Sequence, residues 1–331
     1  MESFDKKLIQ RKEFGFQFDY NIDDKEYNVQ IVYPHKGSNY AIPYILVLPK
    51  QVKDNCVLAV EVNNLETENE NELLNNALLI AYNLTKKLIE YDNPVLVPIL
   101  PSVKNGIPYY QQLARECFSV SNDNKFYRID LQVLNIINEA KQKISERVTV
   151  CEKIFLNGYS SSAVFAQRFA LLHPGIINTL CVGGASGSIP MPITELEYPL
   201  GIADYFDITG KSFDFEKYQQ IKFRYYVGSL EELRKTSNRY DESFNYAPMH
   251  DMSYFDRSVP PMVGLKQRNM FGKSLIERSK KQIFILKEMG LDIEQTIFEG
   301  RTHNNYNGIG PNELGDDFIR KSYQESLRNY R

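Results

Sequence analysis

The sequence is poor in the residues that build metal and disulfide sites. It has four histidines and four cysteines in 331 residues, and no two cysteines form a CxxC pair. Structural zinc sites need Cys and His ligands at close spacing, and disulfide frameworks are typical of short, cysteine-rich secreted chains. We therefore expect no metal site, and buried, reduced thiols at Cys56, Cys117, Cys151 and Cys181.

Two further features are missing, namely long apolar runs and any block of basic residues. No run approaches the roughly 18 apolar residues that a membrane-spanning helix needs, and the N-terminal stretch MESFDKKLIQRKEFGF lacks the apolar core of a signal peptide. The formal net charge is −3, and the 39 Lys and Arg residues are spread along the chain. The expectation is a cytoplasmic protein that binds neither nucleic acid nor membrane.

What the sequence does contain is a regular alternation of short apolar runs and longer helical patterns. The runs predict strands at 27–33, 43–48, 57–62, 94–100, 153–156, 179–182, 221–227 and 293–298. Apolar residues at helical spacing predict helices at 70–90, 127–144 and 312–328, and another that ends near His173. This order predicts an α/β fold with a mostly parallel sheet covered by helices.

Two stretches interrupt the alternation, at 188–218 and 232–273. Both are rich in Pro, Tyr, Asp and Gly, and long irregular insertions in a compact domain are usually functional or mobile. The sequence has no internal repeat and no low-complexity linker. We expect a single α/β domain over 1–331, with the two stretches forming a cap over one edge of the sheet.

The sharpest motif is a strand, a tight turn and a helix around Gly158-Tyr159-Ser160-Ser161-Ser162. The G-x-S-x-G nucleophile elbow of α/β-hydrolases has this form, with the nucleophile at the apex of the turn. Gly158 supplies the first small residue, and Ser162 stands where the second glycine usually lies. The register selects Ser160 as nucleophile, and the N–H of Ser161, at a helix N-terminus, as an oxyanion donor. A serine-rich helix cap is the alternative interpretation.

A serine nucleophile needs a general base. In this fold the triad runs Ser, acid, His along the chain, with the histidine on a late loop. Of the four histidines, His303 alone lies in a loop after the last predicted strand; the others are His35, His173 and His250. We therefore predict His303 as the base.

The triad acid is expected after the strand at 221–227, where the chain reads GSLEE. A carboxylate there would hold the imidazole in one tautomer and stabilise the imidazolium. Glu231 is the favoured acid, and Glu232 and Asp241 are alternatives. A second oxyanion donor is expected from the loop 63–67, where Asn63 and Asn64 are positional candidates.

Over most of its length the chain resembles bacterial α/β-hydrolases of the polyhydroxybutyrate-depolymerase and feruloyl-esterase-like group. The matching stretches include GYSSSAVFAQRFALLHP at 158–174, YVGSLEE at 226–232 and FEGRTHN at 298–304. The resemblance implies a triad of Ser160, Glu231 and His303, with Glu231 in place of the usual aspartate. Secreted polymer-degrading relatives carry signal peptides, so the lack of one here argues against an extracellular polymer as substrate.

Together these features predict a serine hydrolase that cleaves a small-molecule carboxylic ester through an acyl-enzyme, without cofactor or metal. An acyltransferase or a peptidase could use the same triad. A non-catalytic binding module is a third possibility, because fold alone does not determine chemistry.

Overall fold

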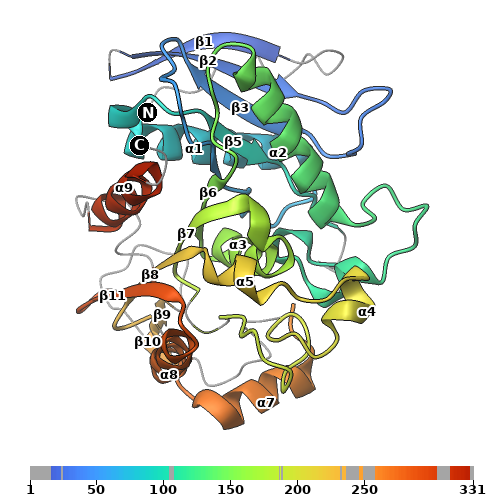
Figure 1. Cartoon of the computed structure of the whole chain (residues 1–331), viewed down its shortest axis with the longest axis vertical. Coiled ribbons are helices and arrows are strands. Elements are labelled where there is room, and N and C mark those ends of the chain that lie inside the picture. Colours follow the sequence, from blue (N-terminus) through green and yellow to red (C-terminus); the bar gives the residue numbers. More distant parts are fainter. Residues whose placement is uncertain are drawn as a thin grey trace.

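A nine-stranded sheet forms the centre of the molecule (Figure 1), with the strand order β1-β2-β3-β5-β4-β6-β7-β8-β11. The computed structural model describes residues 16–23, 25–103, 108–185, 187, 189–231, 233–235, 246–248, 258–303 and 314–328. The strands of the sheet are β1 (Phe16–Ile22), β2 (Lys25–Val32), β3 (Tyr44–Pro49), β4 (Ala59–Val60), β5 (Val95–Pro98), β6 (Ile154–Tyr159), β7 (Ile177–Gly183), β8 (Lys222–Gly228) and β11 (Asp292–Phe298). A separate pair joins β9 (Leu233–Lys235) to β10 (Tyr246–Pro248).

Most of the large sheet is parallel. From β5 across β4, β6, β7 and β8 to β11 every neighbouring pair is parallel, whereas β1, β2 and β3 join it through antiparallel pairs. Strands β3, β5, β6 and β7 are buried at every position. Strands covered on both faces are expected to be nearly continuous apolar runs, which is why these were visible in the sequence.

Helices cover both faces of the sheet. They are α1 (Glu70–Lys87), α2 (Ile129–Ser145), α3 (Ser161–Leu172), α4 (Tyr205–Thr209), α5 (Phe215–Gln219), α7 (Pro261–Phe271), α8 (Leu275–Glu288) and α9 (Leu314–Leu327). Buried residues of α1 and α9 pack in one apolar cluster with one side of the sheet, and those of α2, α3 and α8 pack in a second cluster. The structure therefore confirms the predicted mostly parallel sheet flanked by helices.

Helix α1 shows how local sequence sets an element's ends. The side chain of Asn69 accepts hydrogen bonds from the N–H groups of Asn71 and Glu72, so it caps the helix. Acidic residues lie in the first turn and Lys86 and Lys87 in the last, as the helix dipole favours.

The start of the sheet differs from the prediction. The sequence predicted that the strands at 27–33 and 43–48 open the domain, but β1 precedes them and pairs with β2 along its length. The segment FQFDYNI has polar residues between its apolar ones, and it lies at the edge of the sheet, so it carries no continuous apolar run. The run at 57–62 was also predicted too long, because only Ala59 and Val60 form a ladder with β5 and β6.

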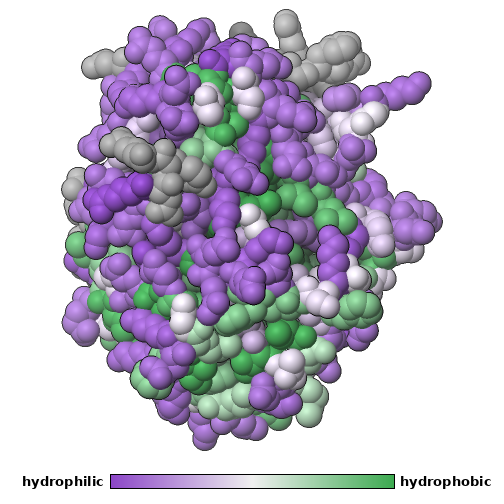
Figure 2. Space-filling view, viewed as in Figure 1, coloured by the Kyte–Doolittle hydropathy of each residue, from purple (hydrophilic) through white to green (hydrophobic). Residues whose placement is uncertain are grey.

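The two predicted insertions contain short elements. Within 188–218 lie α4 and all but the last residue of α5, and the described parts of 232–273 include β9, β10 and α7. These elements occupy the lower half of Figure 1. Apolar groups also gather in the lower half of the surface in Figure 2. Helix α7 leaves Met262 74% exposed and Leu265 49% exposed. A capping role for these segments stays a prediction.

All four cysteines of the chain are free and buried, as predicted. Burial raises the pKa of Cys56 to about 12 and that of Cys151 to about 11. Burial likewise raises the pKa of Cys181 to about 12 and holds that of Cys117 well above its usual range. Among the described residues, no helix has both the length and the apolar character that crossing a membrane requires.

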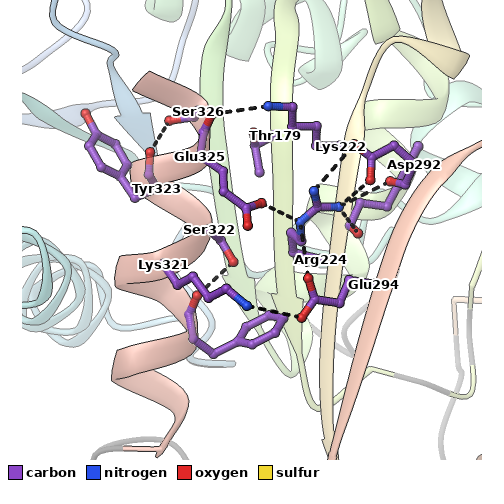
Figure 3. Close-up of polar contacts among 12 residues, drawn as sticks. Thr179, Lys222, Arg224, Asp292, Glu294, Lys321, Ser322, Tyr323, Glu325 and Ser326 are labelled. Atoms are coloured by element: carbon purple, nitrogen blue, oxygen red, sulfur yellow. Dashed lines mark hydrogen bonds and ion pairs between the residues drawn. The ribbon is translucent and has the colours of Figure 1, made fainter. Parts of the chain in front are cut away.

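Arg224 of β8 fastens the last helix to the sheet (Figure 3). Its side chain is 8% exposed; Nε donates to Oε2 of Glu325 in α9 at 2.8 Å, and Nη1 donates to Oδ1 of Asp292 in β11 at 2.9 Å. A buried guanidinium needs opposite charges around it. These contacts join β8, β11 and α9, and a hydrogen bond of 2.8 Å from Tyr323 Oη to the carbonyl of Val57 ties α9 to the segment before β4.

Candidate active site

Ser160 lies at the apex of a sharp turn between β6 and α3. Its backbone angles are φ 57° and ψ −117°, a conformation that non-glycine residues rarely adopt. The N–H of Ser160 donates to the carbonyl of Gly183 at 2.9 Å, which ties the turn to β7. The strand, strained serine and helix reproduce the geometry that the G-x-S-x-G pattern describes.

The close packing of this turn explains its small residues. A Cβ at Gly158 would lie 2.5 Å from the carbonyl oxygen of Ser162 and 2.7 Å from Cα of Ala163, so only glycine fits. Serine is tolerated at position 162 because its hydroxyl turns back into the elbow. Oγ of Ser162 accepts a hydrogen bond of 2.8 Å from the N–H of Tyr159.

The three side chains predicted as a triad form one hydrogen-bonded chain. Nε2 of His303 lies 3.0 Å from Oγ of Ser160, and Nδ1 of His303 lies 2.5 Å from Oε1 of Glu231. Glu231 is 4% exposed and comes from the turn after β8, whereas His303, 17% exposed, comes from the loop after β11. A carboxylate at Nδ1 favours the tautomer in which Nε2 can accept the serine proton. The catalytic roles themselves stay predictions.

Two of the other histidines lie away from this hydrogen-bonded chain. His35 is exposed in the loop between β2 and β3. His173 follows α3, and its Nε2 is 3.0 Å from Oδ2 of the buried Asp130. Glu232, Asp241 and His250 lie outside the described residues. Within the described parts of the chain, no group of three His, Cys, Asp or Glu side chains is placed to hold a metal ion.

Tyr159, which precedes the nucleophile, supports the histidine loop. Its hydroxyl donates to the backbone carbonyl of His303, and the two rings pack with their centroids 5.3 Å apart. The ring of Tyr159 also stacks against that of Tyr226 in β8. A Cβ at Gly184, where φ is +65°, would lie 3.0 Å from Cε1 of His303. Sequence reasoning missed Tyr159 because the second position of the elbow pattern accepts any residue.

The two predicted oxyanion donors differ in the structure. Ser161 is the first residue of α3, where a backbone N–H has no partner inside the helix. Its hydroxyl lies 3.2 Å from that of the half-buried Tyr109, a neighbour that the sequence did not indicate. The N–H of Asn64, however, donates to Oδ1 of Asn76 in α1 at 3.0 Å. A helix side chain therefore already engages the N–H of Asn64, and the oxyanion role of both residues stays a prediction.

The loop that contains Asn64 is nevertheless held firmly beside the elbow. Nδ2 of Asn64 donates to the carbonyl of Tyr159 at 3.4 Å. Oδ1 of Asn63 accepts from the N–H of Leu100 at 2.6 Å, and Nδ2 of Asn63 donates to the carbonyl of Leu100 at 3.0 Å. The carbonyl of Leu65 accepts from Nε2 of the fully buried Gln111 at 2.8 Å. Among the described residues, no acceptor is bonded to the N–H of Leu65.

Comparison with known proteins gives similarity in structure alone. A scan against protein-family models finds no match, and a search of curated proteins also finds none. Poly(aspartic acid) hydrolase-1 from Sphingomonas sp. KT-1 has a TM-score of 0.49 and 12% identity, with 96% of this chain and 98% of that one covered. S-formylglutathione hydrolase from Agrobacterium tumefaciens has a TM-score of 0.47 and 12% identity, over 95% and 99%. Carboxyl esterase 2 from Tuber melanosporum has a TM-score of 0.49 and 8% identity, over 96% and 92%.

Because these identities and TM-scores are low, the fold assignment rests on features of the chain itself. Its sheet is mostly parallel and covered by helices on both sides. Ser160 occupies a strained strand-to-helix turn, and Ser160, Glu231 and His303 occur in the chain order of α/β-hydrolases. The chain has the α/β-hydrolase fold.

Proposed function

We propose that this protein is a serine hydrolase that cleaves a small-molecule carboxylic ester. The observation that supports this most strongly is the hydrogen-bonded chain from Ser160 through His303 to Glu231, with the serine at the apex of the elbow. A base within hydrogen-bond distance of a serine, itself oriented by a carboxylate, is the arrangement that nucleophilic acyl transfer needs.

In the proposed first step Oγ of Ser160 forms a bond to the acyl carbon. Its proton passes to Nε2 of His303, and the π electrons of the carbonyl move to the oxygen. The imidazolium keeps its Nδ1 proton beside Glu231, 2.5 Å away. When the tetrahedral intermediate collapses, the bond to the alcohol breaks and the departing oxygen takes the proton from Nε2. Water then repeats the two steps on the acyl-enzyme and releases the acid.

The developing oxyanion needs donors that are already in place. We assign this role to the N–H of Ser161, which the dipole of α3 strengthens, and to the N–H of Leu65. Leu65 replaces the Asn64 of the sequence prediction, since the Asn64 N–H is bonded to Asn76. The hydrogen bond from Gln111 to the carbonyl of Leu65 orients the loop backbone at Leu65.

The test is hydrolysis of p-nitrophenyl acetate, butyrate and octanoate by wild type, Ser160→Ala and His303→Ala. We expect kcat/KM to fall by about 10⁴-fold or more in both variants. His35→Ala, which removes an exposed histidine, serves as the matched control and is expected to keep wild-type turnover. Unchanged turnover in Ser160→Ala would overturn the proposal. Assays with amide substrates and with alcohol acceptors distinguish a peptidase or an acyltransferase.

A further inference from the structure

A buried carboxyl group lies directly beneath the nucleophile elbow. Glu61, which follows β4, is 8% exposed. Its Oε2 accepts a hydrogen bond of 2.6 Å from Nδ2 of Asn157, and its Oε1 lies 3.2 Å from Oγ of Ser162. Asn157 comes three residues before the nucleophile and Ser162 two residues after it. Glu61 thus contacts both arms of the turn that carries Ser160.

The hydroxyl of Ser162 links this carboxyl group to the backbone next to the nucleophile. It accepts the N–H of Tyr159 at 2.8 Å, and its single proton can go to Glu61 or to the Tyr159 carbonyl, which is 3.0 Å away. Glycine, the residue that the elbow pattern usually has here, could make none of these bonds. The serine and the buried carboxyl group therefore form one unit.

The surroundings of Glu61 make this an unfavourable place for a carboxyl group. Burial raises the pKa of Glu61 above its ordinary value, while Lys87 of α1 and the two hydrogen bonds act in the opposite direction. Lys87 is itself paired with Asp316 at 3.2 Å. A negative charge on Glu61 also acts to raise the pKa of Cys181 in β7 and of Tyr226 in β8. A well-packed apolar side chain commonly stabilises such a site as well or better, so stability alone gives no reason for a carboxyl group here.

We propose that Glu61 is a positioning residue for the nucleophile, which acts through Ser162 and Asn157 to fix the peptide that precedes Ser160. This inference rests on the proposed hydrolase function. The direction of Oγ of Ser160 and of the N–H of Ser161 follows from the orientation of that peptide. A change in its orientation therefore changes the angle at which Oγ attacks the acyl carbon. Loss of the unit is expected to slow the chemical step and to leave substrate binding largely unchanged.

The test measures the reactivity of Ser160 directly, as the rate at which a fluorophosphonate phosphonylates it, with the modified residue identified by mass spectrometry. The kcat and KM for p-nitrophenyl butyrate are measured in parallel. We expect Ser162→Ala and Glu61→Met to lower the labelling rate and kcat by about 10- to 100-fold, with KM changed less than about threefold. Ser322→Ala, which removes a buried hydroxyl that is bonded to the carbonyl of Phe318 in α9, is the matched control and should label at the wild-type rate.

Glu61→Gln is the conservative variant that should restore the network. No donor among the described residues reaches Oδ1 of Asn157, so the Asn157 amide can turn over and accept from the new side-chain amide. We expect labelling within about threefold of wild type in this variant, and no additional loss when Glu61→Met is combined with Ser162→Ala. These two results separate a positioning unit from independent structural effects.

The outcomes distinguish the two proposals. Absence of labelling at Ser160 in the wild type overturns the hydrolase function and this inference with it. Labelling of the wild type at Ser160, together with wild-type rates for folded Ser162→Ala and Glu61→Met, overturns the inference alone. A variant that loses melting temperature but keeps its labelling rate per folded molecule shows a structural role only. If Glu61→Met does not fold, Ser162→Ala and Glu61→Gln still decide the question.

Discussion

Oε1 of Glu231 lies 2.5 Å from Nδ1 of His303, with the carboxyl group almost wholly buried. Glu231→Gln keeps the shape of the side chain but removes the negative charge that, in the proposed mechanism, stabilises the imidazolium. We expect kcat for p-nitrophenyl butyrate to fall by about 10³- to 10⁴-fold, with a small change in KM. Glu231→Asp keeps the charge and should lose less. Activity in Glu231→Gln within a few-fold of wild type would direct the search for the acid to Glu232 or Asp241.

The close packing of Gly158 against the backbone of Ser162 and Ala163 predicts that one added methyl group lowers stability strongly. In Gly158→Ala the new Cβ would lie 2.5 Å from the backbone oxygen of Ser162, and a backbone atom cannot move aside easily. We expect the free energy of unfolding to fall by about 3 kcal/mol or more. Gly175→Ala is the control, because its Cβ meets only the flexible end of Lys217 at 3.1 Å, and should lose less than about 1 kcal/mol. Urea unfolding of both variants measures the difference, and equal losses would contradict the packing argument.

Asp130, at the start of α2, should make stability depend on acidity. Burial acts to raise its pKa, but hydrogen bonds from Arg128 and His173 outweigh burial and lower the pKa from 3.8 to about 2. A depressed pKa in the folded state contributes stability that is complete above about pH 4 and is lost as the pH falls towards 2. In Asp130→Asn we expect this part of the acid dependence to disappear.

The same variant should be less stable at neutral pH, by about 3 kcal/mol, because it leaves Arg128 without its buried partner. Urea unfolding between pH 2.5 and pH 7 tests both statements. Asp207→Asn, at an exposed position in α4, is the control and should follow the wild type throughout. Parallel acid curves for wild type and Asp130→Asn would contradict the assignment.

The Arg224 network predicts how firmly the C-terminal helix is attached. Arg224→Met removes the hydrogen bonds to Glu325 and Asp292, and we expect a loss of about 2 kcal/mol in the free energy of unfolding. Lys321→Met removes a longer and exposed ion pair with Glu294, at 3.7 Å, and should change stability by less than about 0.5 kcal/mol. Hydrogen exchange should accelerate in α9 for the arginine variant only. Unchanged exchange there would show that apolar packing alone holds the helix.

The fold was predictable where the sequence repeats a simple physical pattern. Strands buried on both faces are unbroken apolar runs, and α1 and α2 carry apolar residues at helical spacing. The edge strand β1 has no such run, so it was not predicted. Its partner β2 was predicted from its own residues. The boundaries of β4 depend on which residues the neighbouring strands reach, which the run at 57–62 does not encode.

The candidate site was predictable to the extent that it follows chain order. Ser160, Glu231 and His303 each lie in the turn or loop that follows a strand, so their meeting follows from a parallel sheet whose strand ends share one edge. The availability of a backbone N–H has no such signature. Whether Asn64 can donate depends on Asn76, which belongs to a helix and reaches back to the loop. The contact between Glu61 and Ser162 joins residues 101 positions apart, beyond the reach of any local motif.

The four buried thiols make the native protein a poor target for alkylating reagents. Alkylation requires a thiolate that the reagent can reach. Burial raises the pKa of these thiols, so that few are ionised, and it also shields them from the reagent. The rate of modification under native conditions therefore reports how often each part of the interior opens. Cys56 and Cys151 report on the segments that lead into the central strands β4 and β6, and Cys181 reports on β7. A single cysteine introduced on the surface would react far faster than these four and could carry a dye without removal of any native residue.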